Sequence, residues 1–158
     1  MTEVQDVLAL QDRVFEALPD PAWLRRNSEA MIESCFTLPN RSCTAYRNGQ
    51  LVGFSTLFRA GRGPESLARL LTDDVFVIES SANVKTILVD PDFRGRGVAR
   101  DLLDIMVGSA RLLHIARLHA TVHPNNEPSR SLFRSAGFEP VRHVVTSYGP
   151  RDVWERVL

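Results

Sequence analysis

The sequence Ile-Leu-Val-Asp-Pro-Asp-Phe-Arg-Gly-Arg-Gly-Val-Ala occupies residues 87–99. Its apolar beginning predicts a strand that ends at Pro91, and an amphipathic helix is predicted to start at Gly97. The first-turn N–H groups of a helix lack backbone partners and carry partial positive charge, which attracts anionic oxygen. Gly95 and Gly97 can adopt a positive φ and let a ligand approach the backbone. We therefore expect a phosphate or pyrophosphate to bind here.

Two common phosphate-binding loops fit this segment poorly. A nucleoside-triphosphate loop needs Lys-Ser or Lys-Thr after its second glycine, whereas Lys85-Thr86 precedes the glycines. A dinucleotide loop needs a third glycine, where Arg100 stands, and an acidic residue about 20 positions further on. The chain offers no carboxylate there, near Arg117 and Leu118.

A third interpretation rests on a resemblance carried by two segments. Residues 94–99 resemble the Arg/Gln-x-x-Gly-x-Gly/Ala loop of the GNAT family of N-acetyltransferases. Downstream, residues 123–126 and 131–138 resemble the family's Asn-x-x-Ala-x-x-x-Tyr-x-x-x-Gly-Phe signature, with Asn126, Ser129 and Gly137-Phe138 in the matching positions. The resemblance covers residues 51–145, and its two motifs occur in the family's order and spacing.

The resemblance implies an α/β fold with a central, mostly antiparallel mixed sheet flanked by helices. Apolar periodicity and turn residues predict helices over residues 3–18, 27–36, 97–113 and 127–135, and strands over 43–47, 50–58, 75–78, 84–89, 118–122, 141–148 and 153–158. Asn48-Gly49 is the preferred pair for a tight hairpin turn. Family members usually begin with a strand, and this chain begins with a predicted helix, so we expect the first edge strand to be missing.

Composition limits the classes of protein to consider. The length predicts one domain over residues 1–158, and 44% hydrophobic and 24% charged residues are ordinary for a globular protein. No apolar run is long enough to span a membrane, no signal peptide is evident, and zero net charge argues against general nucleic-acid binding. We expect a cytoplasmic protein. His119 and His123 are roughly 13 Å apart along one strand, so no metal site is expected.

The resemblance implies acetyl-CoA, or another acyl-CoA, as donor and a small-molecule or peptide amine as acceptor. In the family, the strand before the loop pairs with the pantetheine arm, and one of its amides polarises the thioester carbonyl. The donor site implied here comprises Ile87, Leu88, Val89, Arg94, Gly95, Arg96, Gly97, Val98, Ala99, Asn126, Ser129 and Phe133.

Catalysis of amine acetylation also calls for a base and an acid. Glu79 is the first candidate for the base, because it follows the predicted strand 75–78. In some relatives the base maps near Asn83, whose amide cannot accept the proton. The family's usual acid is a Tyr, and Phe133 occupies that position. Tyr148 is our candidate replacement, with Ser131 or water as alternatives.

Two other functions stay open at this stage. A non-catalytic acyl-CoA-binding sensor or recruiting domain would explain Phe133 and the absence of a secure base. A purely structural interaction domain would require both motifs to be coincidental. CoA binding without turnover favours the first, and failure to bind CoA favours the second. The resemblance also suggests a homodimer formed through the C-terminal strands.

Overall fold

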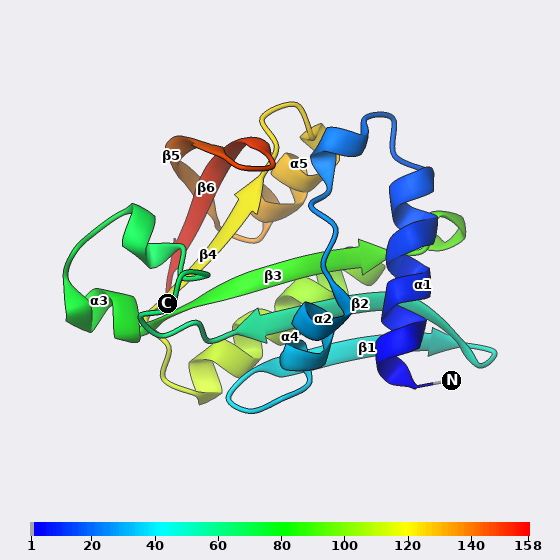
Figure 1. Cartoon of the computed structure of the whole chain (residues 1–158), viewed down its shortest axis with the longest axis horizontal. Coiled ribbons are helices and arrows are strands. Elements are labelled where there is room, and N and C mark those ends of the chain that lie inside the picture. Colours follow the sequence, from blue (N-terminus) through cyan, green and yellow to red (C-terminus); the bar gives the residue numbers. More distant parts are fainter. Residues whose placement is uncertain (1) are drawn as a thin grey trace.

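A computed structural model describes residues 2–158 and contains a six-stranded mixed sheet. The strands are β1 (Arg41–Arg47), β2 (Gln50–Phe58), β3 (Ser81–Val89), β4 (Arg117–Val122), β5 (Glu139–Thr146) and β6 (Gly149–Val157), in the spatial order β1-β2-β3-β4-β6-β5. The α-helices are α1 (Glu3–Glu16), α2 (Glu29–Cys35), α3 (Val75–Glu79), α4 (Val98–Leu112) and α5 (Glu127–Ser135). Within residues 2–158, β3 and β4 pair in parallel, and the other four neighbouring pairs are antiparallel (Figure 1). The predicted fold class is confirmed.

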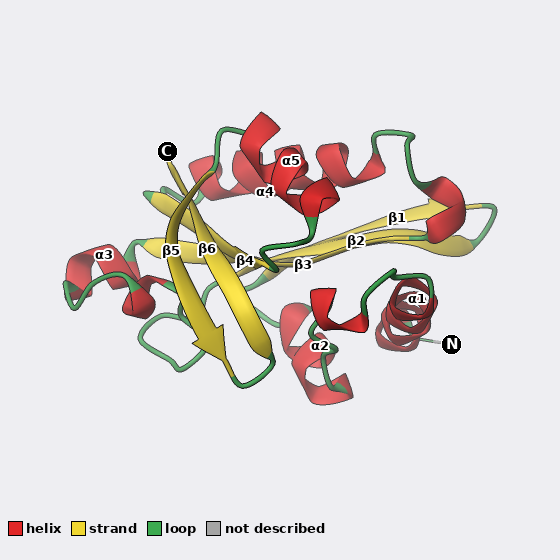
Figure 2. Cartoon of the chain, turned by 90° about the horizontal axis from the view of Figure 1, so that it is seen from above, coloured by secondary structure: helices red, strands yellow, loops and turns green. Residues whose placement is uncertain are grey.

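The helices form two layers around the sheet. Helices α1 and α2 lie on one face, and α4 and α5 lie on the other (Figure 2). Each pair has its own apolar core: Leu10, Ile32 and Phe54 belong to the first, and Leu103 and Trp154 belong to the second. Both cores include buried side chains of the sheet, and this double packing holds the central strands in place.

Local signals account for several boundaries. The Thr2 hydroxyl caps α1 and the Ser28 hydroxyl caps α2. Asn48 and Gly49 both have positive φ, 49° and 77°, as the hairpin turn between β1 and β2 requires. No strand precedes α1 within residues 2–158.

The strand predicted over residues 75–78 was wrong. This segment is helix α3, whose first turn begins where the Asp74 side chain accepts a hydrogen bond from the Phe76 N–H at 2.9 Å. Phe76 is 84% exposed whereas Ile78 is buried, so the helix is anchored through one side and is not part of the sheet. β3 begins at Ser81, earlier than predicted.

The C-terminal hairpin also differs from the prediction. β5 begins and ends two residues earlier than predicted, β6 begins four residues earlier, and the turn lies between Thr146 and Gly149. β5 forms an edge of the sheet with mostly exposed side chains, and dimerisation through it stays a prediction. Within residues 2–158, no helix has the length and apolarity that crossing a membrane requires.

Candidate active site

The parallel pairing of β3 and β4 is short. It runs from the Ser81–Arg117 pair to the Asn83–His119 pair and then stops, although β3 continues to Val89. The two strands diverge beyond that point (Figure 1). A cavity of about 630 Å³ occupies the resulting wedge. The diverging half of β3 therefore has backbone N–H and C=O groups with no strand partner on that side, which a ligand can pair with.

A β-bulge lies in the middle of this unpaired edge. In the pairing with β2, Ser55 faces Ile87 and Thr56 faces Lys85, which leaves Thr86 as the extra residue. Thr86 has φ 62°, a left-handed conformation that is costly for a β-branched residue. The Asn27 side-chain amide donates to the Thr86 hydroxyl at 3.0 Å and helps to hold it there. Bulges re-aim the groups around them, so this one alters how β3 faces the wedge.

Asn27 is itself held by α1. The Gln11 side chain accepts from the Asn27 N–H at 2.8 Å and donates to the Asn27 carbonyl at 3.0 Å. Gln11 is almost fully buried, so these hydrogen bonds form in a shielded environment. The position of the bulge therefore depends on a chain of contacts that starts on the N-terminal helix.

The N-terminus of α4 lies at the end of β3 and has no side-chain cap. Gly97 occupies the N-cap position with φ 80°, and Gly95 has φ 72°. Side chains cap each of the other four α-helices, namely Thr2, Ser28, Asp74 and Asn126. The first-turn amides of α4 are therefore left for another acceptor, and the helix dipole favours an anionic one.

The structure brings most of the predicted donor-site residues together around the cavity. The donor-site residues that line it are Ile87, Val89, Arg94, Gly95, Gly97, Val98, Ala99, Asn126, Ser129 and Phe133, and the candidate acid Tyr148 lines it as well. Leu88 points into the α1–α2 core instead, and the Arg96 guanidinium lies over the Phe93 ring at 5.0 Å. Leu88 can still take part through its backbone, which is the role predicted for it.

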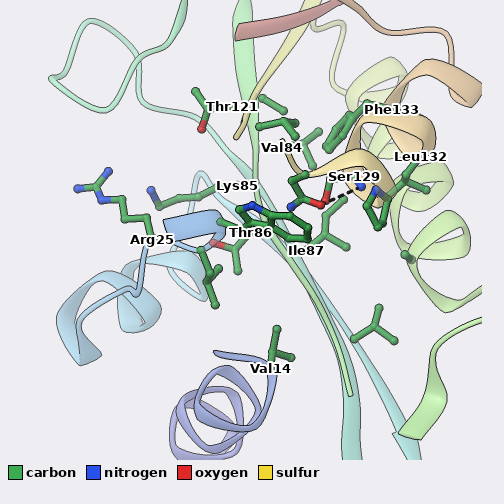
Figure 3. A pocket seen from close by; sticks show the side chains of 18 of the residues that line it. Val14, Arg25, Val84, Lys85, Thr86, Ile87, Thr121, Ser129, Leu132 and Phe133 are labelled. Carbon is green, nitrogen blue, oxygen red and sulfur yellow. Dashed lines mark hydrogen bonds between the residues drawn. The ribbon is translucent and has the colours of Figure 1, made fainter. Parts of the chain in front are cut away.

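The second motif forms the wall opposite β3 (Figure 3). The Asn126 side-chain oxygen caps α5 by accepting from the Ser129 N–H at 3.3 Å. Its amide nitrogen makes no hydrogen bond within residues 2–158 and can donate to a ligand. Phe133 packs edge-on against Phe138, with ring centroids 5.1 Å apart, and presents an apolar surface to the cavity.

Glu79 lies outside the cavity. It is at the end of α3, where its carboxylate accepts a hydrogen bond from Arg62 at 2.9 Å and is half exposed. Glu79 was expected to follow a strand of the sheet, whereas it follows a surface helix that does not lead to the cavity.

One end of the cavity contains charged side chains that were not among the predicted site residues. Lys85 forms an ion pair with Glu65 at 3.0 Å, and Arg25 approaches the same carboxylate at 3.6 Å. Burial raises the pKa of Glu65, but Lys85 and then Arg25 outweigh that effect, so the pKa lies below its ordinary value. Glu65 is the only carboxylate among the described residues that line the cavity. No local signal in its loop pointed to this position.

Asn83 has a structural role at this point. Its side-chain amide donates to the Glu65 carbonyl at 2.7 Å, and its oxygen accepts from the Leu67 N–H at 3.4 Å. These bonds attach the loop before α3 to β3. The position that is a base in some relatives therefore holds the loop that carries Glu65.

The described residues contain no cluster of three or more His, Cys, Asp or Glu side chains arranged to hold a metal ion. His119 instead makes a 2.9 Å hydrogen bond with Glu155, and the His123 ring accepts from the Asn125 N–H at 3.1 Å.

A sequence model of the acetyltransferase (GNAT) family matches residues 4–138. The chain belongs to the GNAT family of acetyltransferases. The resemblance inferred from the glycine-rich loop and the Asn126–Phe138 segment is therefore confirmed. The match extends almost to the N-terminus, further than the two motifs alone indicated.

Known proteins resemble this GNAT chain in sequence and in structure. The N-alpha-acetyltransferase RimI of Mycobacterium tuberculosis is 34% identical over 105 residues, which cover 65% of this chain and 54% of that protein. This chain thus matches about half the length of that relative. The ribosomal-protein-alanine N-acetyltransferase of Brucella melitensis has a TM-score of 0.74 at 21% identity, covering 99% of this chain and 94% of the other.

A third similar protein was solved with a donor. The GNAT superfamily phosphinothricin acetyltransferase of Sinorhizobium meliloti, in complex with acetyl-CoA, has a TM-score of 0.71 at 18% identity, covering 99% of this chain and 85% of the other. At such identities these two structures support the fold alone.

Proposed function

We propose that this protein transfers the acetyl group of acetyl-CoA to the amine of a small molecule or peptide. The observation that best supports this proposal is the wedge between β3 and β4, which leads to the uncapped N-terminus of α4. An extended polar arm fits an unpaired strand edge, and a pyrophosphate fits free helix amides flanked by Arg94. Acetyl-CoA contains both groups, joined in that order, and supplies an acyl group activated as a thioester.

The backbone of β3 would hold the donor and assist the reaction. An amide near Leu88 or Val89 donates to the thioester carbonyl oxygen and stabilises the negative charge that develops there. The new bond joins the amine nitrogen to the carbonyl carbon, and the carbon–sulfur bond breaks. Asn126 can orient the pantetheine or the incoming amine through its free amide nitrogen.

Proton transfer involves a different set of residues from those in the family pattern. An ordinary lysine-like amine has a pKa near 10.4, so its neutral form costs roughly 4–5 kcal/mol at pH 7. The low pKa of Glu65 makes it a weak proton acceptor, so water that leads to solvent is the better path. Tyr148 lines the cavity and is the candidate acid for the departing thiolate.

Two measurements test this proposal. Calorimetric titration should show micromolar binding of acetyl-CoA and no comparable binding of ATP or NADH. A panel of amines should then release free CoA thiol. Binding without turnover on any amine would favour the alternative function, an acyl-CoA-binding sensor, which the apolar Phe133 surface in the cavity supports. No binding would overturn both.

The role of Tyr148 is tested with Tyr148→Phe. We expect kcat to fall at least about tenfold while the Kd for acetyl-CoA stays unchanged. The matched control is Tyr46→Phe, because the only other tyrosine lies on β1, exposed and outside the cavity. Equal kcat values for the two variants would remove Tyr148 from the mechanism.

A further inference from the structure

The Arg151 guanidinium is buried without a carboxylate partner. Arg151, on β6, is 3% exposed and lines the cavity. It donates to the backbone carbonyls of Pro150 and Ala22, each at 2.8 Å. No Asp or Glu oxygen within residues 2–158 lies within 4.0 Å of it. Buried charges are normally paired, and an unpaired one facing a cavity indicates that a ligand brings the opposite charge.

A second guanidinium lies beside it. Arg25 lies 4.5 Å from the Tyr148 ring centroid, and Arg151 lies 5.0 Å from the same centroid. Arg25 therefore shares an aromatic neighbour with Arg151, and its charge lowers the pKa of Arg151 further after the larger effect of burial. Two like charges held on one ring repel each other, and an anion bound near both relieves that repulsion.

The remaining charges do not neutralise this end of the cavity. Glu65 is ion-paired with Lys85 at 3.0 Å and approached by Arg25 at 3.6 Å. Three positive side chains, Arg25, Lys85 and Arg151, thus share one negative side chain, which leaves a net charge of +2.

These residues belong to the acceptor side rather than to the pyrophosphate end. Arg151 contacts the Ala22 carbonyl in the segment between α1 and α2, whereas the pyrophosphate loop leads into α4 on the opposite face of the sheet (Figure 2). In Figure 3, Arg25 and Lys85 lie at one end of the cavity, and Ser129 and Phe133 lie at the other.

A second hollow of about 570 Å³ adjoins this end. It shares Arg25, Glu65, Leu67 and Tyr148 with the main cavity, and it lies between the loop before α3 and the β5–β6 turn. The Arg142 guanidinium donates to the Leu70 carbonyl and connects these two segments. Arg25 therefore borders both spaces, Arg151 borders the main cavity, and the second hollow offers room for the rest of an acceptor.

We propose that Arg25 and Arg151 bind an anionic group of the acceptor, so that the preferred acceptor is an amine that also carries a carboxylate. This inference rests on the proposed acetyltransferase function and specifies its substrate class. Arg151 supplies a pre-positioned charge, and Arg25, whose side chain is 43% exposed, closes on the anion from the solvent side. Lys85 stays paired with Glu65.

The test compares acids with the matching amides, and the peptide pair keeps the reacting amine unchanged because only a side chain further along differs. Initial rates are measured at saturating acetyl-CoA with glycine and glycinamide, with 4-aminobutyrate and its amide, and with the C-terminally amidated peptides Ala-Glu-Ala and Ala-Gln-Ala. In the pair that the enzyme acetylates fastest, we expect the kcat/KM of the acid to exceed that of its amide by at least about tenfold. Equal rates, or faster amides, in all three pairs would overturn the proposal.

Variants connect the preference to the arginines. Arg25→Gln and Arg151→Gln should each reduce the preference for the acid to below about threefold, with the Kd for acetyl-CoA unchanged. Arg111→Gln is the matched control, because it removes the same charge from the exposed end of α4, away from the cavity. The preference should persist in that control. Arg25→Gln decides the test if Arg151→Gln fails to fold, and an undiminished preference in Arg25→Gln would then overturn the proposal.

A binding measurement separates this inference from the proposed function. If no amine in the panel is acetylated, calorimetry on the CoA-saturated protein compares N-acetylglutamate with its fully amidated counterpart. Tighter binding of the acid, by about tenfold and lost in Arg25→Gln, would support the arginine site even though turnover had failed. If the protein does not bind CoA, the same comparison is made on the free protein, and equal binding of the two compounds would overturn the arginine site in either case.

Discussion

Replacement of Gly53 by Ala tests whether close packing under α4 positions the pyrophosphate loop. Gly53 lies on β2, beneath the first turn of α4. A Cβ at this position would lie 2.9 Å from Cγ1 of Val98, 3.2 Å from Cδ1 of Leu102 and 3.3 Å from Cβ of Ala45. The first distance is shorter than carbon atoms tolerate without movement. Because Val98 is the first residue of α4 and its β-branched side chain has few alternative rotamers, we expect the helix start to move, and its free amides to move with it.

The expected effect has two parts. An added methylene in a well-packed site costs about 1–3 kcal/mol, so the free energy of unfolding should fall by that amount. For a chain of this length each kcal/mol lowers Tm by roughly 2–4 °C, which predicts a decrease of roughly 2–12 °C. The displaced amides should also weaken acetyl-CoA binding, and a tenfold rise in Kd would correspond to about 1.4 kcal/mol.

Thermal denaturation and calorimetric titration with acetyl-CoA measure the two parts. Gly108→Ala is the control, because Gly108 lies inside α4 with nothing within 4 Å of its added Cβ. That variant should gain about 0.8–1 kcal/mol from helix propensity and keep the wild-type Kd. Gly53→Ala combined with Val98→Ala should recover part of both losses, with a coupling of at least about 0.5 kcal/mol. Wild-type Tm and Kd in Gly53→Ala, or strict additivity in the double variant, would refute the argument.

Three further predictions concern the donor site, the acid and the core. Gly97→Asp should abolish acetyl-CoA binding, because it places a carboxylate at the N-terminus of α4. Gly97→Asn has the same shape without the charge, and its Kd for acetyl-CoA should rise only about tenfold above the wild-type value. Similar Kd values for the two variants would contradict an anion at this helix N-terminus. Phe133→Tyr should raise kcat by about tenfold, because it adds a proton donor to the cavity wall, with little change in the Kd for acetyl-CoA. An unchanged kcat would show that protonation of the CoA thiolate does not limit the rate. Burial keeps the pKa of His119 below 6.5, against the opposing effect of Glu155. As the pH drops, His119 therefore takes up a proton in the unfolded chain before it does so in the folded protein. The free energy of unfolding should fall as the pH drops below about 6.5, until the pKa of the folded state is reached. His119→Gln should flatten that decrease in Tm, and an equal slope in both proteins would contradict it.

Much of the fold could be predicted because its signals are local. Capping by Ser28, the Asn48-Gly49 turn and the apolar stripe of α4 each depend on residues close in sequence. The error at α3 shows the limit of this approach. Residues 75–78 are β-branched and aromatic, which favours a strand, but Asp74 caps a helical turn there. A strand also needs a neighbour to pair with, and the sequence pattern does not show whether one is present.

The residues of the candidate site also fall into two groups, those that the sequence could identify and those that it could not. The glycine-rich loop and Asn126 could be recognised because each lies in a contiguous motif whose backbone geometry follows from nearby residues. Glu65 and Arg151 could not, because they lie in segments without a motif and reach the cavity only through tertiary packing. The same holds for Glu79, whose exclusion from the cavity follows from the path of the chain.

The sequence by itself determined that a strand, a glycine-rich turn and a helix would place free amides where an anion can bind. Those are short-range consequences of residue type: glycine permits a positive φ, and a helix start leaves N–H groups unpaired. Only the tertiary structure decided that β3 and β4 separate after Asn83 and that Arg25 and Arg151 meet at one tyrosine ring. The reason is physical: the divergence of two strands and the pairing of distant charges depend on how whole layers pack, and no segment contains that information alone.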